Sequence, residues 1–221
     1  MLSGCDQPFE GEITSGMQVR LFGQYDTENE VLYAVAVLVK PKPVAGRLES
    51  MEQTTGGYNV TILTDEDPDL LYFLPETAAI FVGSAKVKYN AWDELAYRIV
   101  NCRDAMNLLK ATLKLDPEAF DPTTVSVMKI DAEMVEGKVE IIYRKSRKIK
   151  LYDGTLIKVV DDPIIHKNSS SSDLDAIYPD DDITAYGLFA CEEDKEDAAD
   201  FYAYIVLASD DDDDDDDDYD D

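Results

Sequence analysis

The sequence predicts an α+β protein that consists mainly of an antiparallel β-sheet or barrel, with one long amphipathic helix. Short runs rich in β-branched and aromatic residues recur along the chain, with turn-forming residues between them. Only residues 91–115 show helical periodicity instead. The chain ends in a nearly unbroken run of aspartates. Together these observations predict one folded domain over residues 1–208 and a disordered acidic tail over residues 209–221.

The N-terminal part of the chain is predicted to form strands. Residues 17–25 and 31–39 flank a short polar loop, a pattern typical of a β-hairpin. The second of these strands is apolar on both faces, so we expect it to be a central strand of the sheet. Residues 58–63 and 79–89 are two further predicted strands, and Gly83 is a candidate bulge in the latter.

The predicted helix is defined by its ends and by one apolar face. Asn90 is the expected N-cap, and Asp116-Pro117 closes the segment. The apolar face consists of residues spaced three and four apart: Trp92, Leu95, Ile99, Cys102, Met106, Leu109 and Leu113. We expect this face to pack on the sheet, although the same spacing would also suit a seam with a partner helix.

The C-terminal half is predicted to be a β-meander. Residues 147–152 and 155–160 flank Asp153-Gly154, which is a strong signal for a tight hairpin turn. Residues 183–191 and 201–207 form the last predicted pair of strands before the tail. The whole chain therefore reads as a sheet or barrel with one helix.

A basic segment stands out against the acidity of the chain. Seven of the 20 basic residues fall within residues 138–158, where only Glu140 and Asp153 are acidic. Cations beside an aromatic ring on an exposed sheet face suit single-stranded nucleic acid, because the cations meet phosphates and the ring stacks on bases. The predicted nucleic-acid-binding residues are Lys138, Arg144, Lys145, Arg147, Lys148, Lys150, Tyr152 and Lys158. An edge hairpin kept soluble by its lysines is the alternative.

The aspartate run needs solvent or a cationic partner, because no packed core can absorb such a density of charge. The chain has 48 acidic and 20 basic residues, a formal net charge of -28. The predicted partner-binding tail consists of Asp210, Asp211, Asp212, Asp213, Asp214, Asp215, Asp216, Asp217, Asp218, Tyr219, Asp220 and Asp221. We expect it to bind a basic protein, or to fold back on the basic hairpin as an internal competitor. No membrane partner is expected.

Sequence signatures of enzymes, metals and cofactors are scarce. The chain has no Gly-rich phosphate loop, no nucleophile elbow and no HExxH motif. His166 is the only histidine, which argues against most catalytic triads and histidine metal sites. Residues 65–76 partly match the spacing of a calcium loop, but Leu70 occupies the position that requires glycine. We therefore expect no catalysis, no cofactor and no metal.

Cysteine usage bears on the compartment. Three cysteines without close spacing predict neither a disulfide framework nor a zinc site, so a cytoplasmic location is expected, in the host cytoplasm or the virion if the protein is viral. Leu2-Ser3-Gly4-Cys5 resembles a lipoprotein cleavage box, but only one residue precedes it in this sequence, so lipidation is not expected. No stretch approaches the roughly 20 apolar residues that span a bilayer.

In layout the chain resembles the single-stranded-DNA-binding proteins of T7-type phages. The resemblance rests on the order of elements, on the hairpin through Asp153-Gly154 and on Tyr219 near the end of an acidic tail. It implies an oligonucleotide-binding (OB)-like barrel and a non-enzymatic role in DNA replication, with the tail recruiting partners. Two other roles remain open: an acidic nucleic-acid mimic or chaperone that binds a basic protein, and a viral structural or assembly protein. Homo-oligomerisation is open in each case.

Overall fold

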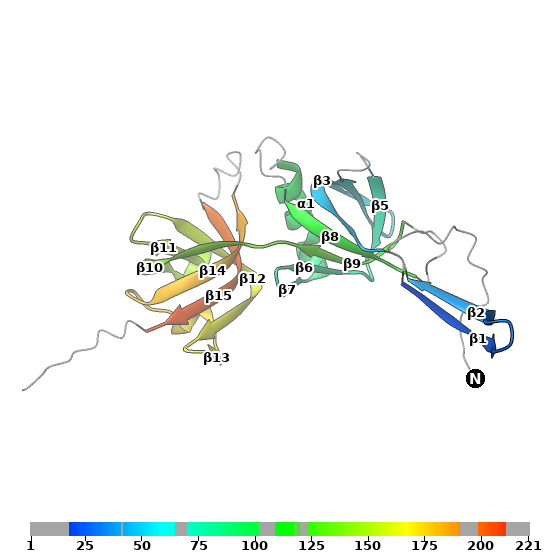
Figure 1. Ribbon diagram of the computed structural model, residues 1–221. Helices are drawn as coiled ribbons and strands as arrows, with labels where there is room; N and C mark the ends of the chain where they lie inside the picture. The colour runs from blue at the N-terminus through cyan, green and yellow to red at the C-terminus, as the bar shows by residue number, and fades with distance from the viewer. Residues whose placement is uncertain are drawn as a thin grey trace, which may run out of the picture. The chain divides into compact units, whose positions relative to one another are not determined.

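The computed structural model describes residues 18–40, 42–64, 70–101, 109–117, 119, 123–190 and 199–210. The chain forms two compact units. One unit comprises residues 1–79 and 110–129, and the other comprises residues 80–109 and 130–221. Strands dominate both units (Figure 1), which confirms the prediction of a mainly β-sheet protein. The prediction of a single domain over residues 1–208 stays a prediction.

The first unit contains two separate sheets. Its strands are β1 (Gln18–Asp26), β2 (Val31–Lys40), β3 (Val44–Thr54), β4 (Gly57–Leu63), β5 (Leu70–Pro75), β8 (Lys110–Leu115) and β9 (Val125–Ile130). Within the described residues, β1 and β2 pair only with each other, as an antiparallel hairpin. The other strands lie in the order β5-β4-β3-β8-β9, and the pairs β4–β5, β3–β4 and β3–β8 are antiparallel.

Two expectations about the N-terminal strands are wrong. β2 is not a central strand, because the described part of the chain provides it with no neighbour other than β1. Residues 79–89 do not form one strand with a bulge. They contain the hairpin of β6 (Ala79–Val82) and β7 (Ala85–Val87), and Gly83 has the positive φ of 60° that this turn requires.

The predicted long helix over residues 91–115 is also wrong. A short 3-10 turn, η1 (Tyr89–Ala91), leads into α1 (Trp92–Asn101), which has 10 residues. Lys110–Leu115 is strand β8, and residues 102–108, including two members of the predicted stripe, lie outside the described residues. Ala111 and Leu113 alternate with polar residues, so this segment pairs with β3 and buries one face, which outweighs its weak helical spacing.

The second unit is built around a closed five-stranded barrel. Its elements are β10 (Glu133–Tyr143), η3 (Arg144–Ser146), β11 (Lys148–Leu151), β12 (Leu156–Lys167), β13 (Ser170–Ser171), η4 (Leu174–Ala176), β14 (Asp182–Phe189) and β15 (Phe201–Ser209). The strand order is β11-β10-β14-β15-β12, and β11 also pairs with β12, which closes the barrel.

The barrel has Greek-key connectivity. β10, β11 and β12 follow one another through short connections, and β14 then returns to lie beside β10. β15 fills the last position, antiparallel to β14 and parallel to β12. The predicted hairpin at Asp153-Gly154 is confirmed, with Gly154 at a φ of 94°. β10 runs without a break through Gly137.

Alternating apolar residues fill the barrel. The buried cluster consists of Val139, Ile149, Leu151, Ile157, Val159, Ile165, Ile177, Ile183, Ala185, Phe201, Ala203, Val206 and Ala208. Burial of each large side chain contributes about 1.5–3 kcal/mol, so this cluster dominates the stability of the barrel. β15 is buried on both faces from Phe201 to Val206.

Part of the outer face of β15 is covered by α1. The guanidinium of Arg98 stacks over the ring of Tyr202, 3.1 Å from its centroid, and Arg98 also pairs with Glu94. Burial raises the pKa of the neighbouring Tyr204 to about 12. β15 is therefore covered on its outer face as well as on its inner face. The predicted basic residues lie elsewhere in the barrel, on β10, β11 and β12 and in the loop between β10 and β11. No helix in the described part of the chain is long and apolar enough to cross a membrane.

Candidate nucleic-acid interface

A row of three outward-facing residues crosses three neighbouring strands of the barrel. Tyr143 on β10 pairs with Lys148 on β11, and Lys148 pairs with Lys158 on β12. The tyrosine side chain is exposed, and both lysines are partly exposed. An aromatic ring beside two cations on a sheet face combines a stacking platform with phosphate contacts. This row, Tyr143–Lys148–Lys158, is named the cross-strand row below.

The next row on the same face is more apolar and is partly neutralised. Ile141 pairs with Lys150, which pairs with Leu156. The Nζ of Lys150 lies 2.6 Å from the Oε2 of Glu140. The hydrogen bond to Glu140 raises the pKa of Lys150, so this lysine is cationic and already has an anionic partner.

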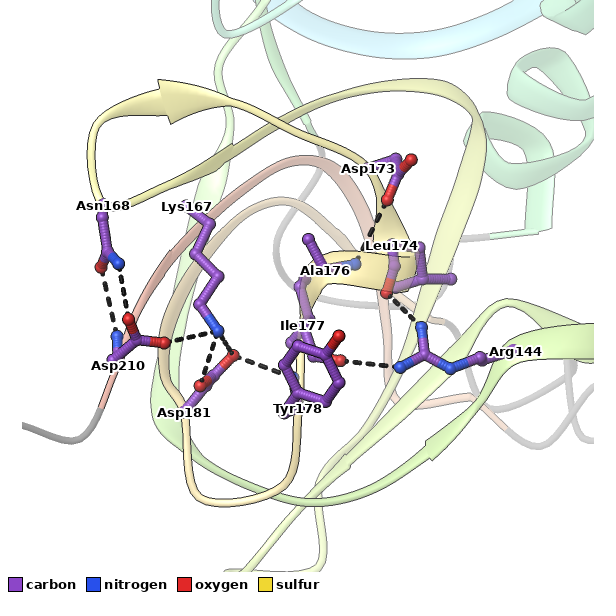
Figure 2. A network of polar contacts seen from close by, with 10 residues as sticks. All are labelled: Arg144, Lys167, Asn168, Asp173, Leu174, Ala176, Ile177, Tyr178, Asp181 and Asp210. Carbon is purple, nitrogen blue, oxygen red and sulfur yellow. Dashed lines mark hydrogen bonds and ion pairs between the residues drawn. The ribbon is translucent and has the colours of Figure 1, made fainter.

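Arg144, in the loop between β10 and β11, is held by the segment around η4. Its Nη1 donates to the Leu174 carbonyl at 2.8 Å and to Oδ1 of Asp175 at 3.0 Å, and its Nη2 donates to the Ile177 carbonyl at 3.1 Å. Figure 2 shows the hydrogen bonds from Arg144 to the Leu174 and Ile177 carbonyls, beside the Tyr178 ring, whose centroid is 5.7 Å from the guanidinium carbon. The guanidinium is therefore fixed in place rather than free to follow a ligand.

Arg147 closes the same loop and is also paired. It adopts a left-handed φ of 54°, and its Nη1 lies 3.3 Å from Oδ1 of Asp161. Its Nη2 donates to the carbonyl of Val160, while its Nε has no partner among the described residues. Lys145, between the two arginines, is exposed.

Tyr152 does not lie in the cross-strand row. It follows the end of β11, and its hydroxyl donates to Oδ1 of Asp180 at 2.7 Å, which raises the tyrosine pKa. Its backbone N–H donates to the carbonyl of Lys138, so these two predicted residues are neighbours at the other end of β11. Tyr143 is not among the nucleic-acid-binding residues predicted from the sequence, but it is the aromatic residue that pairs with Lys148.

The first aspartate of the tail is attached to the barrel. The Nζ of Lys167, at the end of β12, lies 2.6 Å from Oδ1 of Asp210 and 2.8 Å from Oδ2 of the buried Asp181. Asn168 also binds Asp210, through its side-chain nitrogen at 2.7 Å and through its side-chain oxygen to the Asp210 N–H at 3.2 Å. Figure 2 shows these contacts, which are named the tail clip below.

The tail clip perturbs the charges of its members. Hydrogen bonds from Lys167 and Asn168 lower the pKa of Asp210. Burial lowers the pKa of Lys167, but its hydrogen bonds to the two aspartates outweigh this effect and raise it. A lowered carboxyl pKa stabilises the folded state above the ordinary aspartate pKa, and this contribution is lost as the pH falls through the lowered value. The clip therefore persists at neutral pH.

We expect Lys167→Met to lower the free energy of unfolding by about 3 kcal/mol, because it leaves the buried carboxylate of Asp181 without its cation. Asp210→Ala removes only the exposed partner and should hardly change stability. Urea unfolding of the two variants compares these effects. An NMR titration should also show the Asp210 pKa rising towards an ordinary aspartate value in Lys167→Met, while the hydrogen bonds to Asn168 keep it somewhat lowered. Equal stability of the two variants would show that the buried carboxylate of Asp181 does not depend on the charge of Lys167.

A groove of about 570 Å³ lies beside the tail clip. Its lining includes Glu136, His166, Asn168 and Asp182. The two carboxylates make it unsuitable for a phosphate, so the groove is not part of the proposed interface. Among the residues that the structure describes, no group of three histidine, cysteine or acidic side chains could hold a metal ion. Residues 65–69 of the partial calcium spacing lie outside the described part of the chain.

The predicted basic residues thus come together on one side of the barrel, but they are not equivalent. They differ in position: Lys148 and Lys158 align with Tyr143 across the strands, whereas Arg144 and Arg147 lie in or beside the loop between β10 and β11. Arg144, Arg147 and Lys150 also pair with Asp175, Asp161 and Glu140, respectively. Of the predicted tail only Asp210 is described, and residues 211–221 lie outside the described part of the chain.

No protein-family model matches the sequence, and no curated protein is significantly similar to it.

Proposed function

We propose that this protein is a non-enzymatic single-stranded nucleic-acid-binding protein that holds the strand on the outer face of β10, β11 and β12. The observation that carries the proposal is the cross-strand row. Its register aligns Tyr143 with Lys148, and Lys148 with Lys158, on a partly exposed surface. A base would stack on the ring while its phosphates meet the two ammonium groups.

The placement of the two lysines supports an anionic ligand. Lys148 and Lys158 are directly opposite each other across the β11–β12 pair. A phosphate that lies across this pair of strands would meet two ammonium groups at once.

The barrel supports the same reading. A five-stranded Greek-key barrel is the architecture of the OB-fold, and we propose that residues 133–209 form an OB-like barrel. OB-folds bind oligonucleotides on the face of their second and third strands and with the loop between the first two. The corresponding elements here are β11, β12 and residues 144–147, where most of the basic residues lie.

The acidic partners of the predicted basic residues limit the affinity. Arg144, Arg147 and Lys150 must each exchange a carboxylate for a phosphate before they contribute to binding. The cross-strand row is proposed as the principal contact because it aligns an aromatic ring with two lysines on one face. The net charge of -28 repels nucleic acid as a whole. We therefore propose moderate affinity that falls steeply with salt, together with a tail that competes for the face or recruits a basic protein.

Binding is tested with labelled oligo-dT, in fluorescence anisotropy titrations at about 50 mM salt, where electrostatic contacts are strong. Three chains are compared: the full chain, a chain that ends at Asp210 and a chain that ends at Ser209. Removal of residues 211–221 deletes ten aspartates and should strengthen binding about tenfold. The chain ending at Asp210 retains the tail clip, so it separates the effect of the acidic run from the effect of the anchor.

Absence of binding by all three chains would refute the proposal. Capture of basic proteins by the full chain, but not by the two shortened chains, would then favour an acidic mimic or chaperone. Equal binding by all three chains would keep the interface on the barrel but reject the tail as its competitor.

A further inference from the structure

In the part of the chain that the structure describes, the hairpin of β1 and β2 is a sheet with two unpaired edges. The register joins Gln18 with Lys40 at one end and Asp26 with Val31 at the other, with an irregularity between Phe22 and Gly23. Among the described residues, no third strand pairs with either β1 or β2. A two-stranded hairpin is marginally stable by itself in water, so a hairpin of this length is expected to need further contacts.

Both faces of β1 expose large apolar side chains. Leu21 is 51% exposed and Phe22 is 49% exposed. Because consecutive residues of a strand point to opposite faces, these two side chains place apolar surface on both sides of the hairpin. Tyr25 and Tyr33, at 57% and 60% exposure, add aromatic surface.

The sequence of β2 adds an independent observation. Its ten residues, VLYAVAVLVK, are apolar at nearly every position. Such a run is typical of a strand that is covered on both faces and flanked on both edges. The described part of the chain gives β2 one neighbour, β1. β2 therefore has the sequence of a central strand but lies at the edge of its sheet.

The net charge of the β1–β2 hairpin indicates which kind of partner suits its surface. β1 and β2 contain Arg20, Lys40 and Asp26 as their only charged residues, a formal charge of +1 in a chain of -28. A basic protein or a nucleic acid would find few opposite charges here. Two copies of this chain repel each other almost everywhere else, but not along these strands.

Identical strands can also pair around a two-fold axis, because an antiparallel edge is complementary to itself. We infer that the β1–β2 hairpin is a self-association arm, which pairs with the same hairpin of a second copy of this chain. The contact extends the two strands of each copy into a shared sheet and brings the exposed apolar side chains of both copies side by side on its faces. This inference does not depend on nucleic-acid binding.

Sedimentation of the full chain over a range of concentrations tests the inference. Association through the arm should strengthen as salt is raised, because salt screens the repulsion between the two acidic chains. Nucleic-acid binding has the opposite salt dependence, so failure of one proposal is distinguishable from failure of the other. A chain that stays monomeric at about 100 μM in high salt would overturn the inference.

Two substitutions at one arm position make the test specific. Leu21→Asp and Leu21→Lys should each raise the dissociation constant at least about tenfold, and an equimolar mixture should recover association through opposite charges. Recovery in the mixture cannot come from two misfolded chains. The matched control is Leu71→Asp on β5, because Leu71 is 56% exposed and lies on the other sheet of the same unit.

The control should leave self-association unchanged, with circular dichroism confirming that each variant is folded. Equal loss of association in Leu71→Asp and Leu21→Asp would assign the effect to added charge and overturn the arm. A mixture that fails to recover would also exclude pairing of the hairpin with its own copy. If the chain stayed monomeric but bound neutral lipid vesicles, and if Leu21→Asp abolished that binding, the hairpin would contact a membrane. The self-association inference would then be wrong.

Discussion

Reversal of both lysines of the cross-strand row, Lys148→Glu with Lys158→Glu, should lower the affinity for oligo-dT about a hundredfold at low salt. The change removes two phosphate contacts and puts two carboxylates in their place, directly opposite each other on β11 and β12. The slope of log affinity against log salt concentration should fall by about 2 units, because each lost lysine contact releases about one counterion fewer. Anisotropy titrations at several salt concentrations measure both quantities.

The matched control is Lys86→Glu with Lys110→Glu. These two lysines are exposed and lie on β7 and β8, outside the barrel strands, and the net charge changes by the same amount. Similar losses in the two double variants would show that overall charge, not the cross-strand row, governs binding. Tyr143→Ala should also weaken binding by about 1–3 kcal/mol, the usual contribution of one stacked base, and should weaken it more than Tyr152→Ala does.

Gly187→Ala is expected to be the most damaging small substitution in the barrel. A Cβ at this position would overlap the carbonyl oxygen of Tyr202 and would lie 2.8 Å from its carbonyl carbon and 3.0 Å from the Cα of Ala203. These atoms belong to the backbone of β15, so relief requires the β14–β15 pair to separate where its register already shifts. We expect a loss of about 3 kcal/mol in the free energy of unfolding, measured by urea denaturation.

Gly137→Ala, in β10 of the same barrel, is the control. Its Cβ would lie 2.9 Å from Cδ1 of Leu151, which is the end of a side chain and can move by rotation. The expected loss is about 1 kcal/mol or less. If the two alanine variants were equally stable, the close approach of β14 to β15 at Gly187 would not be the constraint that the structure indicates.

Local sequence patterns predicted the strands better than their arrangement. The hairpin at Asp153-Gly154 could be predicted because its turn residues and alternating neighbours act over a few positions. The closure of the barrel depends on β12 pairing in parallel with β15, across a separation that no local pattern encodes. The predicted helix was too long because Leu109 and Leu113 fit the helical period of 3.6 residues. Ala111 and Leu113 fit the strand period of 2 equally well, so the spacing alone could not decide between them.

The candidate site shows the same limit. The density of lysine and arginine in residues 138–158 could be read directly, and the structure does bring these residues to one side of the barrel. Which aromatic residue lies beside the lysines depends on cross-strand register. Tyr143 and Tyr152 are both close to the lysines in sequence, and only the pairing of β10 with β11 distinguishes them. Lys167 could not be found from spacing, because Asp181 and Asp210 reach it from separate segments.

The late position of β15 also has a consequence for how the chain folds. Ile157 pairs with Phe201, so the barrel closes only after a loop of more than forty residues has been ordered. Until then β12 and β14 each have an open edge, and such edges can pair with another molecule. The aspartates begin immediately after β15 in the sequence. We expect their charge to keep partly folded copies apart during this interval, which makes the acidic run a guard against aggregation as well as a ligand for partners.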